Sequence, residues 1–571
     1  MVELLLGPML RYVSETSATI WVETNARCTV SILGRDVPTF CVAGHHYGLV
    51  MIEGLEPNSS TTYDVKLDGE LHWPPTGSEL PPSRIQTLGS EIAPRFIFGS
   101  CRTAAPHEAP WSLELTLDSR GRGVDALYAY ALGMIQQPAE TWPHLAIFLG
   151  DQVYADDAPP KARERIEAIR TKAAETTPYD PETDLPAKLV AGFEEYTWLY
   201  HESWSPEIER WFFSNVPSVM IFDDHEMIDD WNISDSWVRD IRERDWWQDH
   251  VIGGLMTYWL YQHLGNLSPE TIKSEGLVEL LSKVDDGEGI LREWAMGTEE
   301  FTPVTGSGYR FHFYRDIHRV RLVMLDARNA RVLEPGKRRI LDADQWKWTV
   351  EACNVDVDHL LIGTSLPVFV PGGLHDLQVW SEAVCDGAWG WPGRKVGEWL
   401  RRKADMEDWP AFIGSFNELV ELIEQLGNKQ RPEAPATISV LAGDIHFSFV
   451  AEVEFPEGRE LKSRVHQLVS SPIRNALTPP ESTAMRLGTS HFASVVGRFL
   501  RRAARRRRAD VKWKVDHGPT FANSISQLSF ADRSAELVVL KAQPHDDDKA
   551  AMLDRVIDVD LVMGAASQPD L

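Results

Sequence analysis

Residues 144–154 read HLAIFLGDQVY and residues 438–446 read ISVLAGDIH, so two apolar runs each lead into Gly-Asp. An apolar run of this length is typical of a strand that is buried on both faces of a parallel sheet. A carboxylate directly after such a strand lies at the carboxyl edge of the sheet, where open α/β folds hold their ligands. The pattern therefore predicts an α/β domain with Asp151 and Asp444 at one edge of its sheet.

Four further apolar runs also end in polar or sulfur-containing residues: RFIFGSC (95–101), PSVMIFDD (217–224), RLVMLDAR (321–328) and HLLIGTS (359–365). Stretches with helical spacing, such as DALYAYALGMI (125–135), lie between them. Strand–helix alternation of this kind indicates an α/β domain with a mostly parallel or mixed β-sheet.

The first part of the chain has a different pattern. Polar and apolar residues alternate in ATIWVET (18–24), and this alternation predicts an all-β unit. LEPNSSTTYDVKL (55–67) resembles the corner of a fibronectin-type-III sandwich, although its Pro-to-Tyr spacing is longer than usual. We therefore expect a small fibronectin-III-like β-sandwich over residues 1–90 and a second domain over residues 91–571.

The composition excludes several classes of protein. The 571 residues are 43% hydrophobic and 25% charged, and no tract is long and apolar enough to span a bilayer. The five cysteines are scattered and lack CxxC spacing, which argues against a disulfide scaffold and a structural zinc site. A net charge of -28 disfavours nucleic acid as a stable partner. The N-terminus shows no signal peptide or twin-arginine motif, so we expect a cytoplasmic protein.

Taken singly, each polar strand end has an ordinary structural explanation. A lone Asp after a strand often caps a helix, Cys101 can be a small buried apolar residue, and Tyr154 can be a core aromatic. The run FDDHEMIDDW (222–231) is harder to explain in this way. Its carboxylates would repel one another strongly unless cations neutralised them.

Five motifs occur in order with matching strand context: GSCR (99–102), FLGDQVY (148–154), FDDHE (222–226), LDARNAR (325–331) and GDIH (443–446). They resemble those of the alkaline phosphatase D (PhoD-like) family, a branch of the calcineurin-like metallophosphoesterases. The resemblance implies a four-layer α/β domain of mixed sheets after the sandwich, with helical elaborations toward the C-terminus. It also implies hydrolysis of phosphomonoesters or phosphodiesters by a metal-activated hydroxide.

The resemblance also implies a set of metal ligands. Asp151 is the expected bridging carboxylate, and Cys101, Tyr154 and His446 would complete one metal site. Thiolate, phenolate and imidazole together suit Fe³⁺. Asp151, Asp224 and Asp444 would form a second site of oxygen ligands that suits Ca²⁺. Zinc, manganese and magnesium are alternatives for these sites.

Further residues are expected around the phosphate. His225 would act as a general acid or a transition-state donor, with a capping or ligand-supporting role as its alternative. Arg102 and Arg328 would bind phosphate oxygens, or would instead form ion pairs with Asp223 or Asp326. Asp229 and Asp230 stand where the family often has asparagines, so they either add a metal ligand or face solvent.

Two other stretches have open interpretations. HFASVVGRFLRRAARRRRAD (491–510) is a basic amphipathic stretch whose arginines (500–508) could contact an anionic surface or pair with the protein's own acids. Residues 372–396 are rich in Gly and Trp and predict a loop over the active-site mouth, where Trp389 and Trp391 could stack on a substrate or pack as a lid.

The expected partner is a phosphate-ester substrate. Two alternative functions stay open: a catalytically idle scaffold that binds a partner, and a nuclease-like phosphodiesterase. The first would be free to lose ligands that are all present here. The second predicts a long basic groove, which the net charge disfavours.

Overall fold

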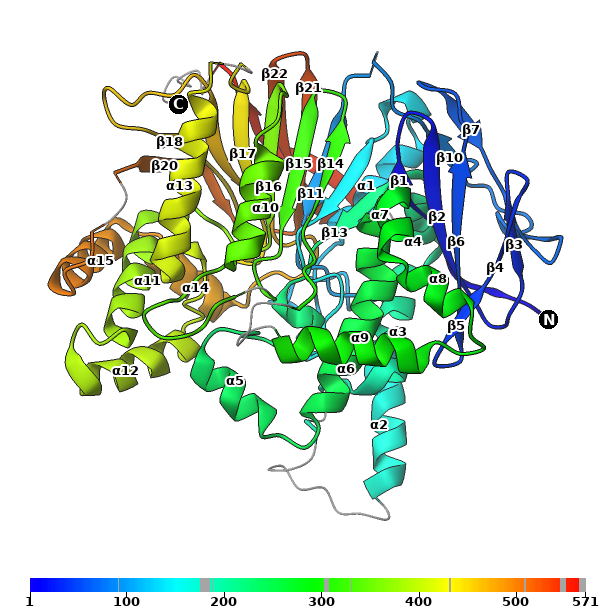
Figure 1. Ribbon diagram of the computed structural model, residues 1–571, viewed down its shortest axis with the longest axis horizontal. Helices are drawn as coiled ribbons and strands as arrows, with labels where there is room; N and C mark the ends of the chain where they lie inside the picture. The colour runs from blue at the N-terminus through cyan, green and yellow to red at the C-terminus, as the bar shows by residue number, and fades with distance from the viewer. Residues whose placement is uncertain are drawn as a thin grey trace.

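The N-terminal strands form two four-stranded antiparallel sheets in the computed structural model, which describes residues 1–90, 92–174, 185–186, 188–301, 308–329, 331–430, 433–507, 510–544 and 551–563 (Figure 1). One sheet has the order β1 (Leu4–Val13), β2 (Ser17–Thr24), β6 (His45–Glu53), β5 (Phe40–Val42). The other has the order β4 (Arg35–Pro38), β3 (Thr29–Ile32), β8 (Val65–Leu67), β9 (Glu70–Trp73). Strands β7 (Ser60–Thr62) and β10 (Arg84–Gln86) form a separate ribbon.

These strands are joined to the rest of the chain by buried polar contacts. Tyr63, the tyrosine of the expected sandwich corner, donates its hydroxyl to the Ser214 carbonyl at 2.6 Å, at the end of α4 (Glu207–Asn215). The Arg11 guanidinium, on β1, donates to the carbonyls of Tyr261 and Gln262 at 2.8 and 2.7 Å. The N-terminal strands are thus built into one body with the second region, and their fibronectin-like character stays a prediction.

The second region is mixed α/β, as expected, and contains two large sheets. The six-stranded sheet has the order β13 (Ser218–Met220), β12 (Leu145–Phe148), β11 (Arg95–Gly99), β21 (Ser524–Ala531), β22 (Ser534–Pro544), β23 (Ala551–Asp560). Strands β11, β12 and β13 are parallel, whereas β21 to β23 are antiparallel. The last strands of the chain therefore complete the sheet that the first α/β strands begin.

The seven-stranded sheet has the order β14 (Phe313–Ile317), β15 (Val320–Leu325), β16 (His359–Thr364), β17 (Thr437–Ala442), β19 (Arg464–Val469), β18 (Ser448–Glu454), β20 (Lys512–Thr520). Strands β15, β16, β17 and β19 are mutually parallel. The six apolar runs of the sequence are thus all strands, but they are divided equally between two sheets.

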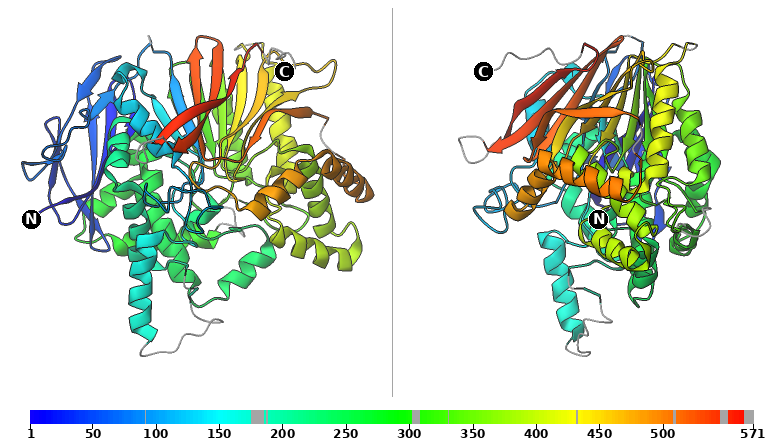
Figure 2. Two further views of the ribbon diagram at one scale, coloured as in Figure 1. Left: turned by 180° about the vertical axis from the view of Figure 1, so that it is seen from behind. Right: turned by 90° about the vertical axis from the view of Figure 1, so that its left-hand side faces the viewer.

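The two sheets pack against each other through their apolar faces. Phe530 on β21 contacts the rings of both Phe96 on β11 and His359 on β16, with centroid distances of 5.4 and 4.9 Å. The His359 ring also hydrogen-bonds the Asp532 carbonyl at 2.9 Å. Helix α1 (Ala126–Ile135) covers the outer face of the six-stranded sheet, and α10 (Ala343–Cys353) and α13 (Ile413–Gly427) cover the seven-stranded sheet (Figures 1 and 2).

Most other helices lie between β12 and β14 or follow β16. The first group comprises α2 (Pro160–Ala174), α3 (Gly192–Trp204), α4, α5 (Asp235–Arg242), α6 (Trp247–Thr257), α7 (Pro269–Glu275), α8 (Leu277–Ser282) and α9 (Glu288–Phe301). The second comprises α11 (Gly372–Cys385) and α12 (Gly390–Lys403), and α14 (Pro479–Gly488) and α15 (His491–Ala503) lie near them. Short helical turns are η1 (Ala139–Thr141), η2 (Asp224–Glu226), η3 (Tyr258–His263), η4 (Leu264–Asn266) and η5 (Trp409–Phe412).

The expectation of a loop over residues 372–396 is wrong, because most of this stretch lies in α11 and the first turns of α12. Within the described ranges, no helix combines the length and the apolar character needed to cross a bilayer.

Candidate metal centre

The carboxyl ends of strands from both sheets meet in one acidic cluster. Oxygen atoms of Asp151, Asp223, Asp224 and Asp444 all lie within 4.8 Å of one another. Asp151 also belongs to a second group, with the Cys101 sulfur and a ring nitrogen of His446, that meets the same distance limit. Asp151 is therefore the carboxylate that the two groups share, which is the position expected of a bridging ligand.

The backbone at this cluster is unusual. Cys101, Asp151, Asp444 and His446 all have positive φ angles, of 57°, 51°, 65° and 54°. Residues other than glycine rarely adopt this left-handed conformation, which costs about 1–3 kcal/mol and persists where the surrounding structure enforces it. Main-chain bonds supply part of that enforcement: the Cys101 amide donates to the Gly150 carbonyl at 3.2 Å. Four of the six predicted ligands thus sit on strained turns directly after strands.

Gly150 is required by the close approach of two strand ends. Its φ is 112°, and a Cβ atom at this position would lie 2.4 Å from the Cβ of Asp223. No side chain fits in that space, so glycine allows the turn after β12 to pass next to the turn after β13.

Cys101, Tyr154 and His446 form the sulfur- and nitrogen-containing side of the cluster. Cys101 is fully buried and accepts a hydrogen bond from the Ser471 hydroxyl at 3.3 Å. Burial and the neighbouring Asp444 raise the pKa of the thiol to about 12. Burial, Cys101 and Asp151 likewise raise the pKa of Tyr154, whose hydroxyl lies 3.5 Å from Asp151. Burial and His225 lower the pKa of His446 to about 4, so its imidazole is neutral near pH 7.

The carboxylates surround the buried guanidinium of Arg328. Its nitrogens pair with Asp224 at 3.0 Å, Asp444 at 2.9 Å and Glu407 at 2.5 Å, and also with Asp223. Arg328 therefore forms the ion pair with Asp223 that the sequence offered as its alternative role. One guanidinium cannot compensate this many carboxylates, because each remaining buried charge carries a large desolvation cost.

The pKa values record this imbalance. Burial raises the pKa of Asp223 to about 6, against the opposing effect of Arg328. Burial raises the pKa of Asp151, with contributions from Cys101 and Asp223, and burial also raises that of Asp444. For Asp224 burial acts in the same direction, but Arg328 and His225 outweigh it and lower the pKa. Protons or cations must therefore occupy the cluster around Asp151 and Asp444.

His225 lies at the edge of the cluster. One of its ring nitrogens lies within 4.8 Å of oxygens of Asp151 and Asp224. Its Nδ1 hydrogen-bonds both carboxylate oxygens of Asp156 at 2.9 Å. Burial lowers the pKa of His225, but Asp156 and Asp151 act in the opposite direction and raise it well above the ordinary value. The surroundings thus favour the protonated imidazole, with Nδ1 committed to Asp156.

Arg102 does not face the cluster. Its guanidinium is buried and contacts Asp125 at 2.9 Å, Glu209 at 2.8 Å and the Ser203 carbonyl at 3.1 Å. Because its donors are used in this way, Arg102 holds α1 and α4 together. It does not form the ion pair with Asp223 or Asp326 that the sequence offered as an alternative. The geometry gives no support to a phosphate-binding role for Arg102.

Several neighbours of the cluster were not among the predicted residues. Asp223 and Asp156 lie inside the quoted motifs or two residues beyond them, so motif position could have indicated both. Glu226 accepts the main-chain amides of Asp151, Gln152 and Asp223 at 2.7 to 3.1 Å and so ties the turns together. Glu407 lies between α12 and η5, away from any strand motif, and only the fold brings it to Arg328.

Asp229 and Asp230 are placed by their main chain. Their amides donate to Asp156 at 2.8 Å and to Asp224 at 3.1 Å. The Asp229 side chain is exposed, and that of Asp230 is partly buried. Burial raises the pKa of Asp230 to about 9, and Glu407 and Asp229 contribute.

The residues of the cluster fit a metal centre. Among the described residues, no donor reaches Oδ1 of Asp151 or Oδ2 of Asp223, although both side chains are fully buried. Buried oxygen atoms without partners are costly, and a cation would satisfy them. The sulfur, phenol and imidazole on one side suit iron, whereas the carboxylates on the other suit calcium or a similar hard cation.

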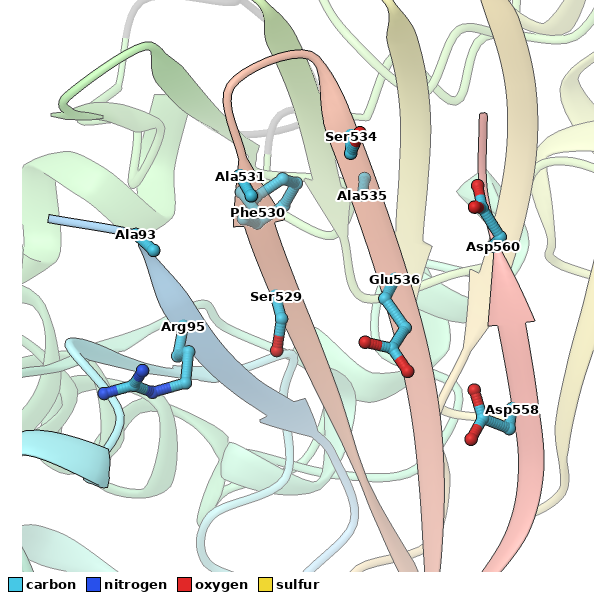
Figure 3. Close-up of a pocket in the computed structure, with 10 residues that line it drawn as sticks. All are labelled: Ala93, Arg95, Ser529, Phe530, Ala531, Ser534, Ala535, Glu536, Asp558 and Asp560. Atoms are coloured by element: carbon cyan, nitrogen blue, oxygen red, sulfur yellow. The ribbon is translucent and has the colours of Figure 1, made fainter. Parts of the chain in front are cut away.

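Two surface cavities lie apart from the carboxylate cluster. The larger, of about 500 Å³, is lined by residues of β21 to β23 and by Ala93 and Arg95, and it contains no residue of the cluster (Figure 3). The smaller, of about 210 Å³, is lined by Thr103 and Asp157 among others, which are next in sequence to Arg102 and Asp156. Of these two cavities, only the smaller is lined by residues that are adjacent in sequence to residues near the candidate centre.

Comparison with known proteins supports the family resemblance. Residues 128–261 match the family of PhoD-like phosphatases, and residues 1–85 match a domain of unknown function, DUF7800. The motif-based resemblance to PhoD-like proteins is thus confirmed. No curated protein matches the chain by sequence.

One solved structure supports the same fold. A structure titled "Structure of PhoD" aligns with a TM-score of 0.55 and 12% identity, covering 96% of this chain and 88% of that chain. At this identity the match shows a shared fold. A maltogenic amylase from S. marinus aligns over 94% of this chain and 76% of its own, with 10% identity and a TM-score of only 0.16.

Proposed function

We propose that this protein is a metal-dependent phosphoesterase that hydrolyses phosphomonoesters or phosphodiesters. The convergence of four buried carboxylates from three separate strand ends carries the proposal, because Asp151, Asp223, Asp224 and Asp444 meet within 4.8 Å. A fold gains no stability from collecting like charges in its interior, so such a cluster indicates a site for cations.

Two groups of residues would hold the cations. Cys101, Tyr154 and His446, with Asp151, form a ligand set suited to Fe³⁺, and Asp151, Asp224 and Asp444 form one suited to Ca²⁺. When bound, cations at such a site polarise phosphoryl oxygens and activate water. Asp151 belongs to both sets and would fix the distance between them.

His225 would donate a proton or a hydrogen bond on the substrate side. Asp156 occupies Nδ1, so Nε2 is the nitrogen that remains for substrate. The raised pKa keeps the imidazole protonated near neutral pH, as a general acid for the leaving oxygen must be. Arg328 would hold Asp223, Asp224 and Asp444 in position and would not itself bind phosphate.

Two observations weigh against the alternatives. Five of the six predicted ligands belong to the two groups around Asp151, and the Tyr154 hydroxyl lies 3.5 Å from Asp151. A catalytically idle scaffold has no need to retain the strained turns that carry four of them. The net charge of -28 would repel a polymeric nucleic acid substrate.

The test is hydrolysis of bis(p-nitrophenyl) phosphate by the purified protein, together with metal analysis and an absorption spectrum. Asp151→Asn should lower kcat/KM by more than about a hundredfold and reduce the metal content, because it removes a ligand that both sites share. Asp118→Asn, which alters an exposed ion pair with Arg120, serves as the control. Undiminished turnover in Asp151→Asn would overturn the proposal, and a colourless protein containing only zinc or manganese would overturn the iron site.

A further inference from the structure

Helices α12 and α15 lie at the end of the molecule farthest from the N-terminal sheets, on either side of α11 (Figure 1). Both pack one face against α11: Leu400 of α12 and Leu500 of α15 contact the apolar cluster formed by Trp380, Ala383 and Val384. The view from that end shows both helices at the surface (right panel of Figure 2). Their opposite faces are therefore turned to solvent.

Large apolar side chains are exposed on those faces. Trp391 and Trp399 on α12 are 68% and 62% exposed, and Phe492 and Phe499 on α15 are 76% and 71% exposed. Leu487 at the end of α14 is 64% exposed. Among the described residues, every exposed Trp and Phe of the chain lies between Trp389 and Phe499 on these helices. Such a concentration marks an interaction surface rather than the scattered apolar residues of an ordinary surface.

The same helices carry a strong positive charge. Eight arginines and no acidic residue lie between Glu481 and Asp510, in a chain whose net charge is -28. Arg501 and Arg506 pair with Asp376 and Asp386 of the neighbouring segment at 2.7 and 2.8 Å, which is the intramolecular role that the sequence offered for this run. Within the described ranges, Arg498, Arg502 and Arg505 form no ion pair. Arg508, the last residue of the run, lies outside the described residues.

Close packing against α11 determines which face of α15 is exposed to solvent. A Cβ atom on Gly497 would lie 2.9 Å from the Cβ of Asp376 and 3.0 Å from the Gly373 carbonyl, so α15 contacts α11 through this glycine. Phe492, Val495, Phe499 and Arg502 follow at helical spacing on the exposed side. The ring of Trp391 on α12 is likewise combined with a cation, Lys395, whose Nζ lies 4.4 Å from the ring centroid.

We propose that α12, α14 and α15 form a docking surface for an anionic lipid bilayer. Phe and Trp side chains between Lys and Arg on one helix face are the composition of a helix that lies in a membrane interface. Aromatic rings insert at the headgroup level while the arginines contact lipid phosphates. The chemistry favours a lipid surface over nucleic acid, because the exposed Phe492, Val495 and Phe499 beside the arginines would be buried among lipid chains but not along a phosphate backbone. This inference does not depend on the proposed phosphoesterase activity.

The experiment is co-sedimentation of the full chain with vesicles of phosphatidylcholine containing about a third phosphatidylglycerol. The wild-type protein should bind these vesicles and bind pure phosphatidylcholine much more weakly. F492S/F499S should weaken binding at least about tenfold, and R498A/R502A/R505A about a hundredfold. Leu71→Ser and R35A/K66A/K347A, which alter exposed residues elsewhere, should bind like the wild-type protein.

All variants should retain the circular dichroism spectrum and the Tm of the wild-type protein, which shows that they are folded. Equal binding of F492S/F499S and wild-type protein would overturn the proposal. A dimer of the wild-type protein that F492S/F499S converts to a monomer would overturn it in favour of a second copy as the occupant. Tight binding of single-stranded DNA that needs the same arginines, without vesicle binding, would overturn it in favour of nucleic acid.

Discussion

His225 and Asp156 form the contact in the site that most directly controls a proton. Asp156→Asn removes the first of the three carboxylates, with Asp151 and Asp224, that raise the pKa of His225. A general acid must be protonated, so activity falls as pH rises through its pKa. We expect the alkaline limb of the pH–rate profile to move to lower pH by roughly 1–2 units. The profile of kcat/KM for a chromogenic ester measures this shift.

Asp157→Asn is the matched control for that experiment. Asp157 is next to Asp156 in the sequence, but it pairs with Arg163 and Lys188 instead of His225. An alkaline limb that stays in place in Asp156→Asn, or that moves equally in Asp157→Asn, would show that Asp156 does not set the protonation of His225.

Arg328 should matter most when the centre holds no cation. Arg328→Met leaves Asp223, Asp224 and Asp444 without their buried counter-charge, which typically costs about 3–5 kcal/mol, whereas Glu407 keeps its pair with Arg331. Cations bound by the same carboxylates would offset part of that loss. We therefore expect Arg328→Met to lower Tm strongly in chelator and to gain more from added metal than the wild-type protein does.

Thermal unfolding with and without Ca²⁺ measures this difference. Arg319→Met removes a half-exposed arginine that pairs with Asp356 and Asp358, and it should show neither effect. If added metal raises Tm by the same amount in Arg328→Met and the wild-type protein, Arg328 and the cations do not share the carboxylates.

At the scale of single residues, the sequence indicated the members of the cluster better than their surroundings. Cys101, Asp151 and Asp444 could be found because each follows an apolar strand, and a strand end fixes where a short side chain points. Glu407 could not, because it follows a helix and reaches Arg328 only through the packing of α12 and η5. The role of Arg102 was also out of reach, since its partners Asp125 and Glu209 belong to separate helices.

The turn after β12 is the element on which the centre depends. Gly150→Ala adds a Cβ atom 2.4 Å from that of Asp223 and must separate the ends of β12 and β13. Gly34→Ala is the control, because Gly34 also has a positive φ, of 76°, but nothing lies within 4 Å of its added Cβ. Both variants bear the backbone strain of about 1 kcal/mol, so the difference between them reports the overlap.

We expect the free energy of unfolding of Gly150→Ala to be lower than that of Gly34→Ala by at least about 2 kcal/mol. We also expect Gly150→Ala to bind less metal. Chemical denaturation and metal analysis measure the two effects. Equal stability and equal metal content in the two variants would show that the approach of the two turns is not needed.

Elements were predicted well where their periodicity was strong. The six apolar runs are all strands, because a continuous apolar stretch bounded by polar residues has few other uses at that length. The stretch 372–396 was predicted as a loop because of its glycines, yet it is largely helical. Gly373 in this stretch and Gly397 directly after it are required for packing: added Cβ atoms would lie 2.7 Å from the Gly488 carbonyl and 3.0 Å from the Cys385 sulfur. Composition alone cannot distinguish a helix–helix contact from a flexible loop.

The division of the strands between two sheets is a property of the whole molecule. β21 pairs with β11 across more than four hundred residues, and no local pattern reports a pairing at that separation. Face-to-face packing of the sheets brings strand ends from both to one place, as Asp151 follows β12 and Asp444 follows β17. The strand pattern by itself predicted convergence at the edge of one sheet, whereas the family resemblance implied several mixed sheets, as the structure has.

The N-terminal sheets and the second region share a buried ionic network. Glu23 on β2 is fully buried and hydrogen-bonds His45 on β6, His201 on α3 and the hydroxyl of Tyr261 on η3, each at 2.9 Å. Burial raises the pKa of Glu23, but the bonds from His201 and His45 outweigh it and lower the pKa below its ordinary 4.5. For His45, burial lowers the pKa, and Glu23 and Glu194 outweigh it and raise the value above 6.5.

These directions set a pH window for the stability that the network contributes. The Glu23 part is present above about 4.5 and is lost as pH falls through its folded-state pKa. The His45 part is fully present below about 6.5 and is lost as pH rises through its folded-state pKa. Glu23→Gln should therefore destabilise the protein most between these two values, by about 3 kcal/mol, and less at alkaline pH. Urea unfolding across pH measures this dependence, with the exposed Glu53→Gln on β6 as control. Because the network joins both regions, Glu23→Gln should shift a single cooperative unfolding transition. A loss of unfolding free energy that does not vary with pH would exclude an ionic origin.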